Sequence, residues 1–339
     1  MSVSFDLTIV WACIIAFAVA MYVVMDGFDL GIGILFRRFR VGDERDQAMN
    51  AIAPVWDGNE TWLVMGGGGL MAAFPLAYAI VLPALYAPLI AMLLGLVFRG
   101  VAFEFRWRDP RHRELWDAAF AGGSILATFA QGVTLGALLQ GITVAGRSYA
   151  GGWWEWLTPF TLLCGAALIV AYALLGSTWL IWRTEGALHD DARRFAKGLL
   201  PATLVAIAAV SLYTPFLEGK YYQRWFAWPG VLFAVQVPLA VTVTGFLLWR
   251  AIAAGRDYAP FVLTLALFAL CMAGLGVSIW PDVIPGRVSI WQAASPAKSQ
   301  TFMLVGVVVL VPLILAYTAW SYWVFRGKVG NDGYHAHDH

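Results

Sequence analysis

The sequence predicts an all-α, polytopic membrane protein with nine transmembrane helices, and two observations support this prediction. Of the 339 residues, 60% are hydrophobic and only 13% are charged, whereas soluble domains carry roughly 25% charged residues. The apolar residues also fall into long runs that are each sufficient for a span of about 20 residues. Since lipid offers no partners to backbone polar groups, helices are the expected form of these runs.

Nine apolar runs are the candidate spans, and their limits are set by the charged segments between them. They cover residues 7–36, 50–74, 76–103, 115–142, 159–182, 195–216, 228–251, 258–280 and 300–325. We therefore expect one transmembrane domain over residues 1–328, followed by a short His-rich cytoplasmic tail over residues 329–339. Several glycines within the runs are expected to let helix backbones approach closely: Gly27, Gly31, Gly66 to Gly69, Gly132 and Gly136.

The positively charged residues indicate how the helices are oriented. Most of the 22 Lys and Arg residues follow the first, third, fifth, seventh and ninth runs. The opposite side has only Arg147, Lys220, Arg224, Arg287 and Lys298. Because positive residues accumulate on the cytoplasmic side of membrane proteins, we expect the N-terminus outside and the C-terminus in the cytoplasm.

Ionisable residues within the apolar runs are the candidate functional residues, because a charge in lipid is costly unless it is paired or hydrated. The first run contains Asp26 and Asp29, and the second contains Asp57 and Glu60. Each pair is three residues apart and so lies on one helical face. Arg99 and Glu104 mark the end of the third run. The predicted topology places all six in the cytoplasmic half of the membrane.

Two interpretations of this group remain open at the level of sequence. A chain of carboxylates at that depth can admit protons from the cytoplasm toward a buried reaction centre. Alternatively, Arg99 and its carboxylates form a structural cluster that only holds three helices together.

The positions of the histidines argue against a haem or metal site in this chain. The five histidines are His112, His189, His335, His337 and His339, and none lies within an apolar run. Because membrane cytochromes hold haem iron mostly through histidine, we expect no haem and no metal here. The C-terminal histidines are expected to have no role in turnover. No basic cluster suggests a nucleic-acid partner.

Four segments resemble subunit II of cytochrome bd-type quinol oxidases. They are residues 25–33 (MDGFDLGIG), 50–63 (NAIAPVWDGNETWL), 98–106 (FRGVAFEFR) and 311–323 (VPLILAYTAWSYW). The short loops look more like the compact, cyanide-insensitive branch of this family. The resemblance implies nine helices arranged as two four-helix bundles and one peripheral helix.

The resemblance also implies a mechanism. Subunit I of such oxidases carries haems b and d, or b only in some variants, oxidises quinol and reduces O2 to water. Charge is separated without pumping. Subunit II binds no haem, supports subunit I and helps to line a proton path from the cytoplasm. The resemblance makes Asp57 a candidate for this path, with Asp26, Arg99 and Glu104 as companions.

The implied location is the bacterial cytoplasmic (inner) membrane, in contact with lipid. The implied partners are subunit I, ubiquinol or menaquinol, and in some complexes a small single-span subunit. Some members hold a structural quinone in subunit II, and its site is not placed by this sequence. The alternatives are a proton-coupled secondary transporter or channel, for which Pro83 and Pro88 give slight support, and a subunit needed only for assembly.

Overall fold

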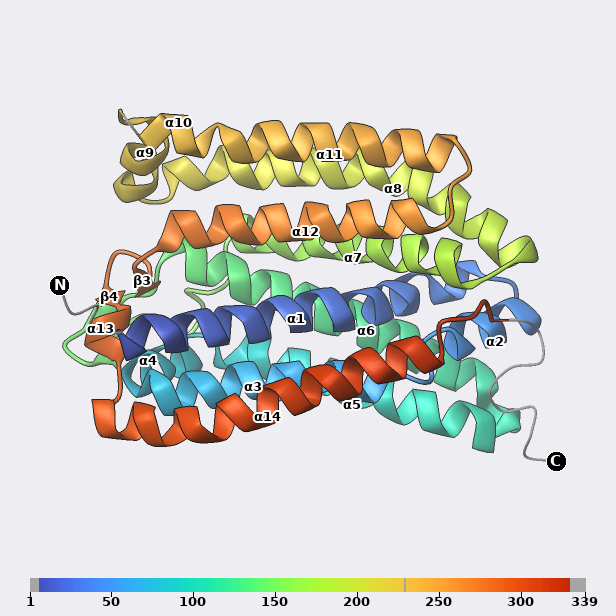
Figure 1. Ribbon diagram of the computed structural model, residues 1–339, viewed down its shortest axis with the longest axis horizontal. Helices are drawn as coiled ribbons and strands as arrows, with labels where there is room; N and C mark the ends of the chain where they lie inside the picture. The colour runs from blue at the N-terminus through green and yellow to red at the C-terminus, as the bar shows by residue number, and fades with distance from the viewer. Residues whose placement is uncertain (1–5, 229, 330–339) are drawn as a thin grey trace.

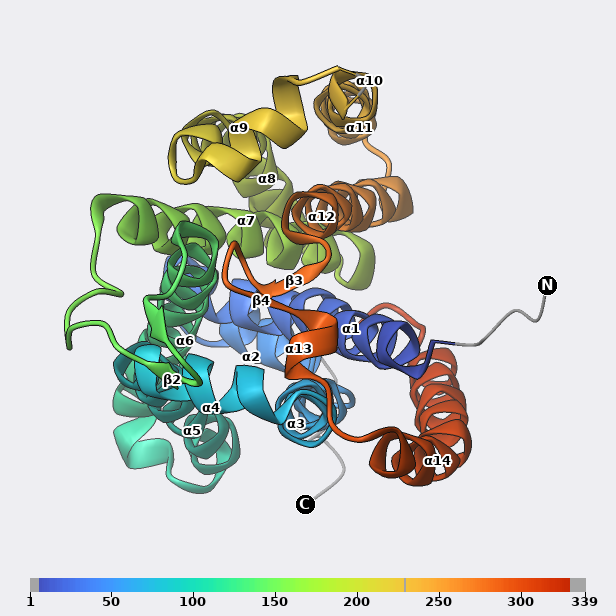
Figure 2. The same cartoon turned by 90° about the vertical axis from the view of Figure 1, so that its left-hand side faces the viewer.

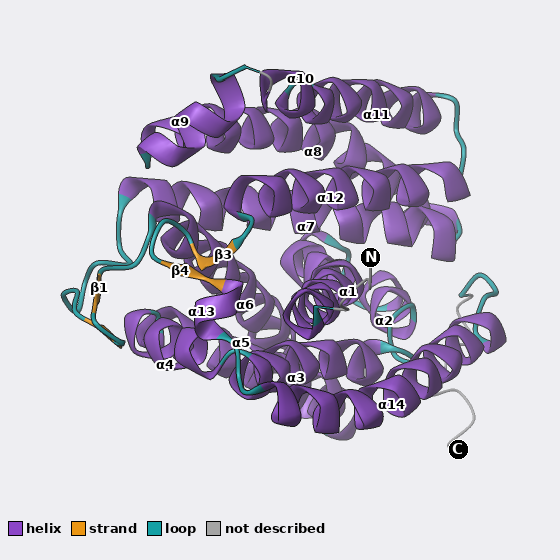
Figure 3. Ribbon diagram, turned by 60° about the vertical axis from the view of Figure 1, so that its left-hand side comes forward, coloured by secondary structure: helices purple, strands orange, loops and turns teal. Residues whose placement is uncertain are grey.

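Helices make up nearly all of the regular structure in the computed structural model, which describes residues 6–228 and 230–329 (Figures 1 and 3). The α-helices are α1 (Leu7–Leu35), α2 (Asp43–Asn50), α3 (Trp56–Ala73), α4 (Pro75–Ala84), α5 (Tyr86–Arg108), α6 (Arg113–Gln140), α7 (Pro159–Arg183), α8 (Gly186–Tyr213), α9 (Gly219–Phe226), α10 (Gly230–Ala234), α11 (Gln236–Ala253), α12 (Tyr258–Ile279), α13 (Ile290–Ala293) and α14 (Ala297–Val324). Two short antiparallel hairpins, β1 (Val144–Ala145) with β2 (Ser148–Tyr149) and β3 (Asp282–Ile284) with β4 (Val288–Ser289), lie in loops. The all-α prediction is confirmed.

Eight helical segments of the described residues are long and apolar enough to cross a membrane. They contain α1, α5, α6, α7, α8, α10 with α11, α12 and α14. The protein is thus a multi-pass membrane protein. The second predicted span corresponds to α3, which is not among the eight although it is 18 residues long and packs along α1. Its polar first turns and its four consecutive glycines account for its lower hydropathy.

Prolines explain two places where the predicted span limits were wrong. The second span begins at Trp56 rather than at residue 50, because the chain turns around Pro54 and a separate helix, α2, precedes it. The third span is divided at Leu85 into α4 and α5. Pro88 has no N–H to donate to the carbonyl four residues earlier, so a continuous helix is interrupted there.

The long helices run side by side in two groups that meet where α1 and α6 pack on α7 (Figures 1 and 2). One group contains α1, α3, α5 and α6, and the other contains α7, α8, α11 and α12. Helix α14 lies outside both groups, along α1 and α3. Gln300 is the buried residue of α14, so most of this helix presents apolar side chains outward.

Glycines set the closest helix contacts, as expected for Gly31 and Gly132. A Cβ atom at Gly31 of α1 would lie 1.9 Å from the backbone oxygen of Tyr172 in α7. A Cβ atom at Gly132 of α6 would lie 2.5 Å from the backbone oxygen of Cys164. By contrast, Gly67 and Gly68 face open space within 4 Å, so these two residues do not pack within this chain.

Polar contacts attach the C-terminal end of the described chain to the helical body. The Val329 N–H donates to the Arg183 carbonyl (2.8 Å), and Gln47 Nε2 donates to the Val329 carbonyl (2.7 Å). Lys328 Nζ lies 2.7 Å from Asp257 Oδ2. The histidines predicted to form a tail belong to residues 330–339, which lie outside the described residues.

We expect the attachment of this end to depend on the charge of Asp257. Burial opposes ionisation of Asp257, but the hydrogen bond and charge of Lys328, together with His189 and Arg193, hold the pKa of its carboxyl below the usual range. Since the pKa is lowered on folding, this stabilisation is complete above the unfolded-state value of about 3.9 and is lost as the pH falls through the folded value.

Asp257→Asn should therefore speed hydrogen exchange at the Val329 N–H by about two- to fivefold at neutral pH, the effect of a surface ion pair. The wild-type exchange should approach that of the variant only below about pH 4, after correction for intrinsic exchange. Asp190→Asn, at an exposed position of α8, is the matched control. Equal exchange in Asp257→Asn and the wild type at pH 7 would contradict this role.

Candidate functional site

Two of the predicted acids lie in the most buried part of α1. The segment MDGFDLGIG, residues 25–33, is buried at every position. Gly27 and Gly31 allow α7 to pack directly on one face of α1. Asp26 and Asp29 lie on other faces of the same segment, toward α5 and α3, and are fully buried, with 0% of each residue exposed. Ionised carboxylates in such a place need partners, because desolvation otherwise costs several kcal/mol.

Arg99 of α5 is the cationic partner of this group. Its Nη1 lies 2.5 Å from Asp26 Oδ1, and its Nη2 donates to Glu60 Oε1 of α3. One guanidinium thus joins α1, α3 and α5. The Arg99 side chain is 2% exposed and that of Glu60 is 28% exposed, so Glu60 connects the buried pair to the surface of the chain.

Asn59 connects Asp29 to the last helix. Its Nδ2 donates to Asp29 Oδ2 (2.8 Å) and to the Met25 carbonyl (3.2 Å). Its Oδ1 accepts a hydrogen bond from the Tyr322 hydroxyl of α14 (2.9 Å). We call Asp26, Asp29, Asn59, Glu60, Arg99 and Tyr322 the buried polar network.

A second chain of neutral polar groups begins one helical turn from Asp26. Gln131 Nε2 of α6 donates to the Tyr22 hydroxyl of α1 (2.5 Å), and its Oε1 accepts from the Tyr172 hydroxyl of α7 (3.0 Å). Tyr22 and Asp26 are four residues apart, hence on the same face of α1. These three residues, and also Asn59 and Tyr322, were not predicted as site residues from the sequence. Their being neutral polar side chains within apolar runs was the signal that could have identified them.

The buried polar network contains more acids than bases. Three carboxyl groups, Asp26, Asp29 and Glu60, share one guanidinium. Among the described residues, Asp26 Oδ2 and Asp29 Oδ1 have no hydrogen-bond donor, although both atoms are buried. These two oxygens are positions where a proton would relieve both the excess negative charge and the missing hydrogen bond. The arrangement is therefore suited to holding and passing protons.

The other two predicted residues lie outside this network. Asp57 is exposed in the first turn of α3, three residues before Glu60, where the helix dipole favours a negative charge. Glu104 is exposed on α5, and its carboxylate lies 4.0 Å from Arg108. Asp57 lies on the same helical face as Glu60, whereas the pair with Arg108 is the one ion pair of Glu104 among the described residues.

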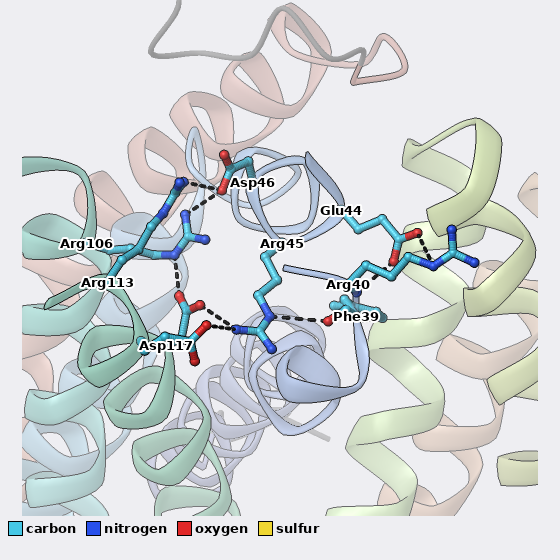
Figure 4. Close-up of polar contacts among 9 residues, drawn as sticks. Phe39, Arg40, Glu44, Arg45, Asp46, Arg106, Arg113 and Asp117 are labelled. Atoms are coloured by element: carbon cyan, nitrogen blue, oxygen red, sulfur yellow. Dashed lines mark hydrogen bonds and ion pairs between the residues drawn. The ribbon is translucent and has the colours of Figure 1, made fainter. Parts of the chain in front are cut away.

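A separate ion-pair cluster lies where α2, α5 and α6 meet (Figure 4). Asp117 accepts from Arg45 (2.7 Å) and from Arg106, and Asp46 accepts from Arg106 (2.7 Å) and from Arg113. Here each acid is held by two arginines, so no carboxyl group is left for a proton. We interpret this cluster as a structural clamp, in contrast to the buried polar network.

No group of three or more His, Cys, Asp or Glu side chains suited to a metal ion occurs in residues 6–228 and 230–329. The two histidines of that part of the chain are already bonded. His112 contacts Asp109 (2.8 Å), and His189 contacts the Ile181 carbonyl (3.0 Å) and Arg193 (3.1 Å).

Comparison with known proteins places these features in a family. The family model described as cytochrome bd terminal oxidase subunit II matches residues 7–325, which is nearly the whole chain. The chain belongs to this subunit II family. It is 30% identical to cytochrome bd-I ubiquinol oxidase subunit 2 of Escherichia coli, over 98% of both chains. It is 28% identical to cytochrome bd ubiquinol oxidase subunit 2 of Bacillus subtilis, over 95% of this chain and 96% of the other.

The fold of this subunit II chain is also shared with a solved oxidase. A chain in the structure of bd oxidase from Geobacillus thermodenitrificans superposes with a TM-score of 0.75 at 13% identity, covering 94% of this chain and 99% of that one. Family membership makes this subunit II chain a component of a terminal oxidase, which is an oxidoreductase complex. It also implies association with a subunit I.

Proposed function

We propose that this chain is the haem-free subunit of a cytochrome bd-type quinol oxidase and carries part of the path by which protons reach the oxygen-reducing centre. The observation that supports this role is the buried polar network, in which Asp26, Asp29 and Glu60 share the single cation of Arg99. Acids are retained at such positions in membrane proteins mostly where ions or protons move.

The proposed path begins at the end of the molecule where α2 and the C-terminal end of α14 lie (Figure 1). The arginine-rich segments that predict the cytoplasmic side gather at this end, so we place it in the cytoplasm and the N-terminus outside. Protons would pass from Asp57 at the surface to Glu60, and then to Asp26 and Asp29 around Arg99. This uptake from the cytoplasm separates charge without pumping.

The proposed complex lies in the bacterial inner membrane. Subunit I would hold the haems, b with d or b alone, and would oxidise ubiquinol or menaquinol. In this arrangement α3 and α14 count as the second and ninth spans. A small single-span subunit and a structural quinone would be additional components, as in some relatives of this family.

Purification from the native membrane tests the proposed function most directly. The chain should copurify with a haem-bearing partner that gives b-type or d-type bands in a reduced-minus-oxidised spectrum and supports quinol-dependent oxygen uptake. A colourless protein without a partner, from a membrane that retains its oxidase, would exclude this function. The buried acids would then favour the transporter alternative, to which the family gives no support.

Glu60→Gln should slow oxygen uptake by about tenfold or more, since a positioned proton-transfer group contributes on the order of 10²–10⁴ in rate. Glutamine retains an oxygen for Arg99 but cannot carry a proton. The haem bands and the subunit ratio should be unchanged. Glu114→Gln is the matched control, because the Glu114 side chain is 65% exposed and pairs with Arg45 (3.4 Å), away from the buried polar network.

Asp57→Asn should also slow turnover, and less than Glu60→Gln does, because water can replace an exposed carboxylate as the proton donor. Full activity of both variants in an intact complex would show that the acids are structural. The chain would then be a subunit required only for assembly.

A further inference from the structure

We propose that Tyr322 of α14 is a positioning residue for Asp29, which acts by fixing the orientation of the Asn59 amide. This inference rests on the proposed proton path. It assigns a role in that path to the peripheral last helix, which lies outside both groups of helices and contributes no acid to the network.

The hydrogen-bond partners of the Asn59 amide indicate its orientation. An amide has one accepting end and one donating end, and the two have nearly the same shape. The Tyr322 hydroxyl donates to Asn59 Oδ1 (2.9 Å), while Nδ2 donates to Asp29 Oδ2 (2.8 Å) and to the Met25 carbonyl (3.2 Å). In the opposite orientation Oδ1 would face two acceptors, and Nδ2 would face the hydroxyl.

The orientation of this amide affects how Asp29 holds a proton. An N–H donor stabilises an ionised carboxylate, whereas an amide oxygen at the same place would accept from a protonated one. With the Tyr322 hydroxyl in place, the donor faces Asp29. Without it, Asn59 Oδ1 loses its donor and the amide is held only through Nδ2, by the Met25 carbonyl and Asp29, so it can turn its oxygen toward the protonated acid more readily.

The charged groups around Asp29 do not hold the Asn59 amide, which is oriented by the Met25 carbonyl and Asp29 on one side and by Tyr322 on the other. The titratable and charged groups that face Asp29 or Tyr322 are Asp26 of α1, Glu60 of α3, Arg99 of α5 and Arg183 of α7. None of them makes a hydrogen bond with the Asn59 side chain, whose partners among the described residues are Met25, Asp29 and Tyr322. The Tyr322 side chain is half-buried and packs beside Trp179 and Arg183, with its hydroxyl directed to Asn59.

The test compares Tyr322→Phe with Tyr317→Phe in the complete oxidase. Tyr317 is on the same helix and is 70% exposed, so its variant removes the same hydroxyl from a position without a role. We expect the limb of the pH–activity profile that depends on Asp29 to move upward by about half to one pH unit in Tyr322→Phe, the effect of one hydrogen bond. Tyr317→Phe should follow the wild type.

An infrared measurement separates this inference from the proposed function. The carboxyl band that disappears in Asp29→Asn should shift in Tyr322→Phe and stay unchanged in Tyr317→Phe. If Asp29→Asn leaves oxygen uptake unaltered, the proton path through Asp29 is wrong, yet a shifted band would still support the positioning role. If the band and the pH profile of Tyr322→Phe both coincide with those of Tyr317→Phe in an assembled complex, the positioning role is wrong.

Discussion

Arg99→Gln is expected to prevent most of the complex from assembling in a stable form. The substitution leaves Asp26 fully buried beside Asp29 and removes the bond that joins α1 and α3 to α5. Removing one partner of a buried ion pair costs about 3–5 kcal/mol, because the other charge stays in a low-dielectric environment without compensation. The measurement is the yield of haem-bearing complex and its thermal unfolding in detergent.

Arg108→Gln is the control for this experiment. Arg108 lies nine residues further along α5, its side chain is 75% exposed, and its carboxylate partner Glu104 is 4.0 Å away. A pair of this kind contributes at most about 1 kcal/mol, so the yield should match that of the wild type. Normal yield and stability of Arg99→Gln would mean that the acids are protonated throughout and need no cation.

Gly31→Val is expected to abolish folding of the chain. Even the Cβ atom of alanine would lie 1.9 Å from the Tyr172 backbone oxygen and 2.8 Å from the Gly176 nitrogen. Since both contacts are with backbone, no side-chain rotation relieves them, and α1 and α7 must separate. This separation would open the buried segment of α1 over residues 25–33, so we expect no folded subunit in the membrane by quantitative immunoblotting.

Gly198→Ala of α8 provides the matched control, because a Cβ atom there meets nothing within 4 Å. Alanine is favoured over glycine by roughly 1 kcal/mol in a helix interior, so the level of this variant should equal or exceed that of the wild type. A stable, active Gly31→Ala variant would contradict the close α1–α7 contact.

The helices of the fold could be predicted closely where proline is confined to the first turn of the apolar run, as at Pro159 and Pro260. The predicted spans over residues 159–182 and 258–280 end within one residue of α7 and α12. Around Pro54 and Pro88 the predicted span limits were wrong, because hydropathy does not detect the loss of a backbone N–H. It also gave no sign of α2, a polar helix of eight residues.

The candidate site was predictable only for its charged members. Asp26, Asp29, Glu60 and Arg99 stand out in apolar runs, and the topology put them at one depth. Tyr322 could not be paired with Asn59 in this way, because the two are 263 residues apart in sequence. Their contact depends on how α14 packs along α3, and packing leaves no periodic signal in a helix that is apolar on all sides.

The packing of α1 on α7 has a consequence for the order of events during synthesis. Asp26 can pair with Arg99 as soon as α5 has been inserted, when less than a third of the chain has been made. Burial of the face of α1 that carries Gly31 needs Gly176 of α7, which emerges much later. At the usual 5–20 residues per second, several seconds separate the two events. During that interval the early ion pair with Arg99 keeps the Asp26 carboxylate from facing lipid without a partner, so Arg99 stabilises α1 in the nascent chain before α7 covers it.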